Sequence, residues 1–280
     1  MELLVSTEWL AARLGAPDLR ILDATYFALE PEKDAAAAFA AGHIPGARFL
    51  DLPQLADPAD PLPGMAPPAG QFAARMGALG IGPADRIVLY DQAPHHTSAR
   101  AWWLFRLFGV DRVALLDGGF AKWWAEGRPV ESGAAADPGG GSLAVSRHPE
   151  WVRDKAAMLA ILAGRSAQIL DARSAPRFTG EEGDPRPAIA PGHIPGSRNL
   201  PYGRLFNPDG TWMRGEALAA EFVAAGVDLD RPIVTTCGSG VTASVLLFGL
   251  ALLGRDDGAL YDGSWSEWGA DPATPKATGG

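Results

Sequence analysis

The sequence predicts an α/β protein made of two tandem domains, each a mainly parallel sheet flanked by helices. Three observations lead to this fold class. Short apolar segments alternate with helical patterns, the same landmarks occur twice along the chain, and 280 residues with 47% hydrophobic content are enough for real cores. Domains usually have about 100–200 residues, so this length lies between one large domain and two of ordinary size.

The predicted elements alternate along the chain. The strands are short, rich in aliphatic residues and bounded by turn residues or aspartates, as buried strands of a parallel sheet are. The segments between them have apolar residues at helical spacing. In chain order we expect a helix over 7–14, a strand over 19–23, a helix over 71–79, a strand over 87–90, a helix over 98–108, a strand over 113–116, a helix over 155–163, and strands over 168–171, 233–236 and 259–261.

Four landmarks of the first half return in the same order about 145–150 residues later. Ile-Leu-Asp-Ala returns at 169–172, and Gly-His-Ile-Pro-Gly returns at 192–196. Asp85-Arg86 is echoed by Asp230-Arg231, and Asp117-Gly118 by Asp262-Gly263. Such a series indicates a duplicated domain. We therefore expect a first domain over 1–135, a linker rich in Gly and polar residues over 136–150, and a second domain over 151–280 whose last ten residues fray.

The charge of the chain excludes several classes of partner. There are 24 Lys and Arg against 33 Asp and Glu, a net charge of −9. An acidic chain has no basic surface for nucleic acid or for an anionic membrane. The most apolar run, 245–253, is far shorter than the roughly 20 residues of a membrane helix and predicts a buried helix. The first residues lack a basic segment before an apolar one, so we expect a cytoplasmic protein.

The chain has a single cysteine, Cys237. One thiol excludes an internal disulfide and a Cys-rich metal site, and we expect neither a metal nor an organic cofactor. Cys237 lies between a predicted strand and a predicted helix, followed by Gly238 and Gly240. Such a loop directs backbone N–H groups inward, favours an anion and lowers the pKa of a thiol. The alternative is a buried structural cysteine.

The corresponding position in the first half is Asp91, followed by Gln-Ala-Pro-His-His. This loop lacks both the nucleophile and the glycines. The first domain is therefore expected to be catalytically silent.

These motifs resemble a known family. The paired Gly-His-Ile-Pro-Gly loops, the paired Asp-Gly turns and the loop Cys-Gly-Ser-Gly-Val-Thr-Ala are similar to those of the two-domain rhodanese (sulfurtransferase) family, and within it to the 3-mercaptopyruvate sulfurtransferases. The resemblance covers nearly the whole chain, from residue 3 to residue 268. It implies a transferase in which a cysteine persulfide on Cys237 carries sulfur from 3-mercaptopyruvate to cyanide, a thiol or thioredoxin, with release of pyruvate.

The resemblance also assigns roles to individual residues. Arg177 and Arg186 match the arginines that bind the donor carboxylate, a role that suits forked guanidinium groups. Ser239, His43 and Asp34 match a proton relay to the departing pyruvate. The loop residues that would hold the donor and the outer sulfur are Gly238, Gly240, Val241 and Thr242.

Three alternatives remain open. The first is a thiosulfate:cyanide sulfurtransferase, although the family members that use thiosulfate have basic residues where this loop has Gly238 and Ser239. The second is a phosphatase of the same fold, which needs an arginine where this chain has Ala243. The third is a non-enzymatic persulfide carrier, which the complete loop of the second domain argues against.

Overall fold

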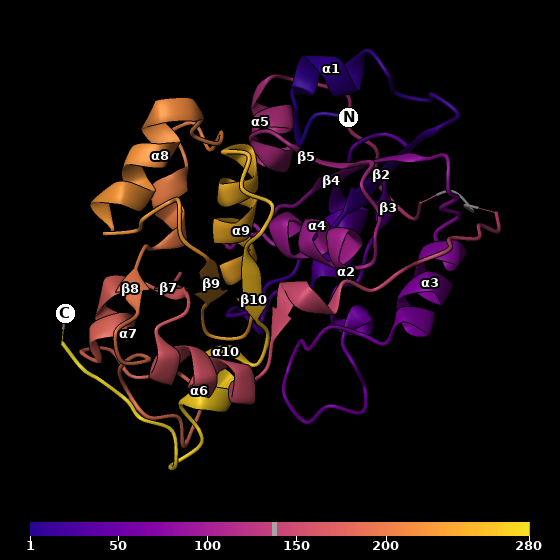
Figure 1. Ribbon diagram of the computed structural model, residues 1–280. Coiled ribbons are helices and arrows are strands. Elements are labelled where there is room, and N and C mark those ends of the chain that lie inside the picture. The colour runs from indigo at the N-terminus through magenta and orange to yellow at the C-terminus, as the bar shows by residue number, and fades with distance from the viewer. Residues whose placement is uncertain (136–138, 280) are drawn as a thin grey trace. The chain divides into compact units, whose positions relative to one another are not determined.

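The computed structural model describes residues 1–135 and 139–279, which form two compact units by their internal contacts (Figure 1). The first unit contains Met1–Pro58, Ala66–His148 and Phe206–Trp212. The second contains Ala59–Met65, Pro149–Leu205 and Met213–Gly280. Each unit thus includes a short segment from the opposite half of the sequence, which the repeat did not predict. The domain boundaries at 135 and 151 stay a prediction, and residues 136–138 of the expected linker lie outside the described residues.

In the described part of the first unit, five parallel strands form one sheet in the order β1-β5-β4-β2-β3. The strands are β1 (Leu4–Val5), β2 (Leu19–Asp23), β3 (Arg48–Phe49), β4 (Arg86–Tyr90) and β5 (Val113–Leu116). Five α-helices and a short 3₁₀ helix connect them within the same residues: α1 (Thr7–Ala11), α2 (Ala35–Ala41), η1 (Pro53–Leu55), α3 (Ala69–Ala78), α4 (Ser98–Leu107) and α5 (Gly119–Ala125).

The second unit repeats this arrangement. Its described strands lie in the order β6-β10-β9-β7-β8, again all parallel. They are β6 (Val152–Arg153), β7 (Gln168–Asp171), β8 (Arg198–Asn199), β9 (Ile233–Thr236) and β10 (Ala259–Tyr261). The helices are η2 (Pro149–Trp151), α6 (Lys155–Gly164), α7 (Ala175–Thr179), η3 (Tyr202–Leu205), α8 (Gly215–Ala224), α9 (Ala243–Leu252) and α10 (Ser264–Trp268). The predicted fold class and duplication are confirmed.

The sheet register refines one of the sequence matches. β2 pairs Arg20 with Ile87, and β7 pairs Gln168 with Ile233. Since Arg20 and Gln168 both precede the repeated Ile-Leu-Asp, Ile233 corresponds to Ile87. Arg231 then takes the place of Asp85, because Pro232 is the residue that corresponds to Arg86. The match of Asp85-Arg86 to Asp230-Arg231 takes Pro232 as one extra residue, whereas the continuous register of the strands sets Arg231 in the place of Asp85.

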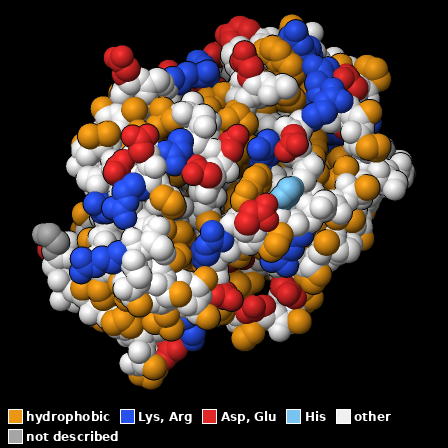
Figure 2. All heavy atoms as spheres, in the orientation of Figure 1, with side chains coloured by type: hydrophobic (Ala, Val, Ile, Leu, Met, Phe, Trp, Pro, Cys, Tyr) orange, Lys and Arg blue, Asp and Glu red, His pale blue; other side chains and the backbone are white. Residues whose placement is uncertain are grey.

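The cores follow from apolar side chains on both faces of each sheet. In the first unit Leu10, Val88 and Trp123 are completely buried, and in the second Met158, Ile194 and Trp268 are. The apolar helix α9 is buried over residues 243–251, as predicted. Among the residues that the structure describes, no helix has the length and apolarity to cross a membrane. Figure 2 shows basic side chains interspersed with acidic ones over the visible face.

The expectation of a fraying C-terminal tail is wrong. Ala277 and His193 exchange two backbone hydrogen bonds of 2.8 and 3.0 Å, and the Gly279 N–H donates to the Thr179 carbonyl at 2.8 Å. Trp268 also donates its indole N–H to the Pro275 carbonyl at 2.8 Å. These long-range contacts hold a segment whose Gly and Pro content alone indicated disorder.

Candidate active site

The loop between β9 and α9 places Cys237 at the carboxyl end of the second sheet, where ligands of parallel α/β sheets bind. Cys237 is buried, with 2% of its surface exposed. Its N–H donates to the Ser264 Oγ at 3.2 Å, and its carbonyl accepts from the Trp265 N–H at 3.0 Å. Ser264 holds a left-handed conformation at φ 49°, which is strained for a residue with a side chain. The turn before α10 therefore supports the cysteine loop.

The backbone of this loop offers hydrogen-bond donors that the chain does not use. In the described structure, the N–H groups of Gly238, Ser239, Val241 and Thr242 have no acceptor within hydrogen-bond reach. Gly240 has φ 80°, a left-handed conformation that turns the chain back toward α9. The helix begins at Ala243 and has ten residues, so its amino end adds a favourable field for an anion. The loop can therefore hold a negatively charged sulfur.

Arg177 and Arg186, both expected near the nucleophile, lie beside this loop. A Cβ placed on Gly238 would be 3.6 Å from Arg177 Nη2 and 3.7 Å from Arg186 Nη2. Arg177 comes from α7, and Arg186 from the polar segment that follows it. The absence of a side chain at Gly238 thus leaves the space between the cysteine and the two guanidinium groups open.

Asp184, which the sequence analysis did not select, holds both arginines. Its Oδ2 accepts from Arg177 at 2.6 Å, and Arg186 forms a two-pronged ion pair with it at 2.8 Å for each oxygen. Its side chain is 1% exposed. Burial by itself would raise the pKa of Asp184, but its hydrogen bonds and ion pairs with the arginines outweigh burial and lower the pKa to about 2. Asp184 lies seven residues after Arg177 and two residues before Arg186, and this position between the two arginines was the signal in the sequence that could have identified it.

The two arginines differ in the donors that they keep free. Arg186 also donates to Ser266 Oγ and, at 3.3 Å, to the Gly238 carbonyl, so its guanidinium is largely used. Arg177 donates only through Nη2, and its buried Nε has no acceptor among the described residues. Arg177 is therefore the less engaged of the two arginines, because only its Nη2 donates within the described chain, whereas Arg186 braces the loop.

Two further residues of this region were not selected from the sequence. Burial raises the pKa of the Tyr202 phenol, and the negative charge of Cys237 raises it further, so the phenol and the thiol interact electrostatically. Gly64, in the 59–65 segment of the second unit, has φ 75°, and a Cβ there would be 3.7 Å from the Ser239 carbonyl. No local pattern connects residue 64 to residue 239, so only the fold brings them together.

The described contacts of the predicted relay residues in the first unit are local. The Asp34 carboxylate caps α2, accepting from the N–H groups of Ala36 and Ala37 at 2.9 and 3.1 Å. His43 is buried, stacks on Phe39 with ring centroids 4.0 Å apart, and has Nδ1 2.9 Å from the Phe39 carbonyl. Its Nε2 lies 3.8 Å from the Glu131 carboxylate.

His193 repeats the arrangement of His43 in the second unit. It stacks on Phe178 at 3.8 Å, and its Nδ1 lies 2.8 Å from the Phe178 carbonyl. The shared geometry shows that the Gly-His-Ile-Pro-Gly loop uses its histidine to anchor the preceding helix. Within the described residues, no group of three or more His, Cys, Asp or Glu side chains is arranged to hold a metal ion.

Two sheets of the same strand order, one of them ending in a cysteine loop with open N–H groups, define a tandem rhodanese-like fold. The Rhodanese-like domain family matches residues 6–126 and 154–271. The 3-mercaptopyruvate sulfurtransferase of Escherichia coli K12 is 39% identical over 272 residues, which cover 97% of this chain and 96% of that protein. The thiosulfate sulfurtransferase of Bos taurus is 36% identical, with coverages of 95% and 91%.

A solved structure agrees with these relatives. The crystal structure of SseA from Escherichia coli, described as a 3-mercaptopyruvate sulfotransferase, matches with a TM-score of 0.86 and 37% identity, over 95% of this chain and all of that one. The chain belongs to the rhodanese-like family, in two tandem copies. It is a sulfurtransferase enzyme, and as such it has a small-molecule sulfur donor and an acceptor.

Proposed function

We propose that this enzyme takes sulfur from 3-mercaptopyruvate, forms a persulfide on Cys237, and releases pyruvate. The observation that carries the proposal is the pair of guanidinium groups within 4 Å of the position next to Cys237, one of which keeps free donors. A guanidinium fork binds a carboxylate by two parallel hydrogen bonds. With the carboxylate of 3-mercaptopyruvate bound to Arg177, the sulfur-bearing carbon of that molecule would face the Cys237 thiol.

The charge of the site favours a donor with one negative charge. Arg177 and Arg186 contribute two positive charges and Asp184 one negative charge, a net charge of +1. 3-Mercaptopyruvate carries one carboxylate, whereas thiosulfate is a dianion. A basic side chain at position 238 would lie next to Arg177 and Arg186, and because this chain has glycine there, the site lacks the additional cation that a dianion favours.

The proposed transfer has two half-reactions. The Cys237 thiolate attacks the donor sulfur, a sulfur–sulfur bond forms, and the carbon–sulfur bond breaks with its electron pair on the departing carbon. The thiol proton of the donor ends on that carbon, which gives pyruvate. The persulfide anion is held by the open N–H groups of Gly238, Ser239, Val241 and Thr242, with Gly240 shaping the turn. Cyanide, a thiol or reduced thioredoxin then takes the outer sulfur and restores the thiolate.

Ser239 is the proposed first carrier of the donor proton. Its hydroxyl follows Cys237 by two residues and makes no hydrogen bond in the described structure. The family resemblance extends this proposal to His43 and Asp34 as its partners. Replacement of Ser239 by Ala should lower kcat more than it raises KM, because proton transfer affects the transition state and not donor binding.

The test measures the intact mass of the protein and the amount of pyruvate released. Intact-mass measurement after treatment with 3-mercaptopyruvate should show one added sulfur atom, which cyanide removes, and stoichiometric pyruvate. The thiol-free variant Cys237→Ser should show neither. Persulfide formation without pyruvate, or an equal mass gain in the variant, would contradict the proposal.

Thiosulfate as the main donor is the second candidate, favoured by the 36% identity to the bovine thiosulfate sulfurtransferase. Comparison of kcat/KM for the two donors decides between them. We expect 3-mercaptopyruvate to have the higher value.

A further inference from the structure

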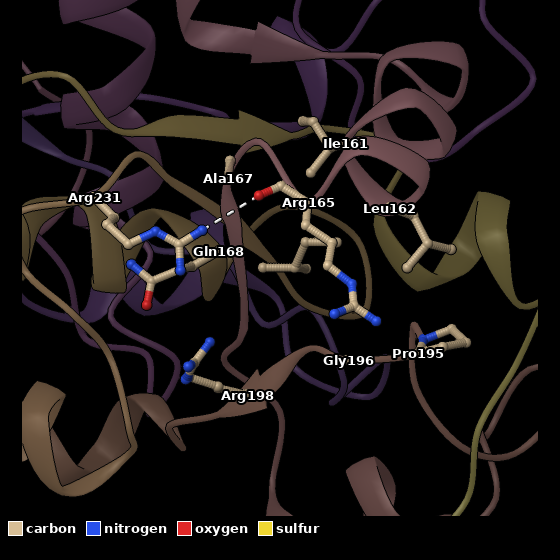
Figure 3. A pocket seen from close by; sticks show the side chains of 10 residues that line it. Ile161, Leu162, Arg165, Ala167, Gln168, Pro195, Gly196, Arg198 and Arg231 are labelled. Atoms are coloured by element: carbon tan, nitrogen blue, oxygen red, sulfur yellow. Dashed lines mark hydrogen bonds between the residues drawn. The ribbon is translucent and has the colours of Figure 1, made fainter.

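The second unit has a pocket far along the sheet from Cys237. It has a volume of about 490 Å³ and lies where β7 and β9 begin, whereas Cys237 follows the last residue of β9. Because the strands are parallel, the pocket lies at the amino ends of the strands and Cys237 lies at their carboxyl ends. The lining residues are Ile161, Leu162, Arg165, Ala167, Gln168, Ile169, Pro195, Gly196, Arg198 and Arg231 (Figure 3).

Three arginines from separate segments line this pocket. Arg165 follows α6, Arg198 begins β8, and Arg231 precedes β9. Figure 3 labels all three side chains. Arg231 donates to the Arg165 carbonyl at 3.2 Å, which ties two of the three segments together. In the described structure none of the three has a carboxylate within ion-pair distance, although ion pairs occupy other arginines of this unit. The nearby acids Asp228 and Asp230 do not line the pocket.

At the corresponding end of the sheet in the first unit, the arginines are paired with carboxylates of the same unit. There Arg86 forms a two-pronged ion pair with Asp18, at 2.8 Å for each contact, and Arg20 lies 3.2 Å from Asp85. In the second unit, Ser166 replaces Asp18, and the register puts Arg231 in the place of Asp85. Gln168 and Pro232 likewise replace Arg20 and Arg86, so both ion pairs are lost together and Arg231 leaves this corner with a net positive charge.

Three guanidinium groups without a carboxylate partner among the described residues make this pocket basic in an otherwise acidic chain, which favours an anion from outside. Guanidinium groups bind phosphate and carboxylate oxygens in a forked geometry. The aliphatic side chains of Ile161 and Leu162 form a different wall, which suits an apolar body. The volume is in the range of pockets for small molecules, about 300–1,000 Å³.

We propose that this pocket binds a small organic molecule that has a dianionic phosphate group and an apolar body. The phosphate oxygens lie among Arg165, Arg198 and Arg231, and the apolar body lies on Ile161 and Leu162. The site is separate from the proposed donor site at Arg177, so it stands whether or not 3-mercaptopyruvate is the donor.

The test measures binding of phenyl phosphate to the full chain by calorimetry. The variant Arg165→Asn/Arg231→Gln removes two charges, and Asn suits the left-handed backbone of residue 165, which has φ 51°. We expect the affinity for phenyl phosphate to fall at least about tenfold, the usual effect of losing a charged hydrogen bond. Inorganic phosphate should bind more weakly than phenyl phosphate, and phenol should not bind.

Two control variants locate the binding. Arg204→Gln removes a mostly exposed arginine of the same unit, and Arg177→Gln removes a guanidinium group at the cysteine loop. Both should keep the affinity, and the double variant should keep its melting temperature and its sulfur transfer. Unchanged affinity in the double variant, or loss of binding in Arg177→Gln, would overturn the proposal. Glutarate binding as tightly as phenyl phosphate would overturn the assignment to phosphate.

Discussion

The loops that follow β4 and β9 occupy the same place in two copies of one fold. Only the loop after β4 is filled by side chains of the protein itself. In the first unit Asp91 accepts the Ser98 N–H at 2.7 Å, so a carboxylate of the protein occupies the amino end of α4. The Gln92 side chain donates to Asp23 at 3.0 Å and to the Gly42 carbonyl at 3.1 Å. In the second unit the loop after Cys237 has glycines in place of such side chains, and the N–H groups of Gly238, Ser239, Val241 and Thr242 have no acceptor among the described residues.

The difference shows how a duplicated fold keeps one binding site and closes the other. The strand–loop–helix geometry attracts an anion in both copies. One copy supplies the anion itself as Asp91, and the other leaves the position to an external negatively charged sulfur. Burial raises the pKa of Asp91 to about 6, the cost of keeping a carboxylate in a closed loop.

The largest expected effect comes from removing the nucleophile. Cys237→Ser should lower kcat/KM for sulfur transfer by on the order of 10⁴-fold or more, because the persulfide cannot form. The matched control is Asp91→Asn at the corresponding position of the first unit, which should keep full activity. Steady-state rates with 3-mercaptopyruvate and cyanide check both. A double variant Cys237→Ser/Asp91→Cys should stay inactive, and recovery of activity would show that the closed loop is competent.

The next effect concerns the arginine with free donors. Arg177→Gln should lower kcat/KM for 3-mercaptopyruvate by about 10- to 150-fold, the equivalent of about 1.5–3 kcal/mol for a charged hydrogen bond. The loss should appear mainly in KM, because the carboxylate is bound equally in the ground state and the transition state. Arg204→Gln, remote from the loop, serves as the charge-matched control. An unchanged KM would remove Arg177 from the donor site.

Asp184→Asn should change both selectivity and stability. Loss of the carboxylate raises the local net charge from +1 to +2, so the ratio of kcat/KM values should move toward dianionic thiosulfate. The pKa of Asp184 is lowered from 3.8 to about 2 in the folded chain. Its stabilising contribution, on the order of 2 kcal/mol, is therefore complete above about pH 4 and is lost as the pH falls toward 2.

Denaturant unfolding at pH 7 and at pH 3 measures this contribution. The wild-type chain and the variant should differ clearly at pH 7 and less at pH 3. An equal difference at both values would mean that the carboxylate charge does not stabilise the arginine cluster.

The smallest effect on sulfur transfer is expected for the closed loop of the first unit. The pKa of Asp91 is raised from 3.8 to about 6, so the native state loses stability as the pH rises from about 4 to 6 and is constant above. Asp91→Asn removes this dependence on pH, which is on the order of 3 kcal/mol in the free energy of unfolding. Hydrogen exchange of the α4 amides at pH 4 and pH 7 measures it. A variant that is less stable than the wild-type chain at pH 7, where Asp91 is ionised, would show that the charge of Asp91 is needed.

Several features of the molecule were readable from local pattern. The alternation of short apolar segments with helical ones predicted the strands and helices, because the spacing of apolar residues differs between a buried strand and a helix with one buried face. The repeated motifs predicted two equal sheets, and the glycines after Cys237 predicted an open loop at a helix start. The roles of Ser239, His43 and Asp34 stay predictions.

What the sequence determined by itself were features written within a few neighbouring residues: the fold class, the duplication, and the difference between Cys237 and Asp91. Tertiary structure alone decided which distant side chains meet. It placed Asp184 between both arginines, Tyr202 within electrostatic reach of Cys237, and Gly64 against Ser239. The physical reason is that such contacts depend on strand register and packing, and the register sets Pro232 where the first unit has Arg86 and Arg231 where it has Asp85.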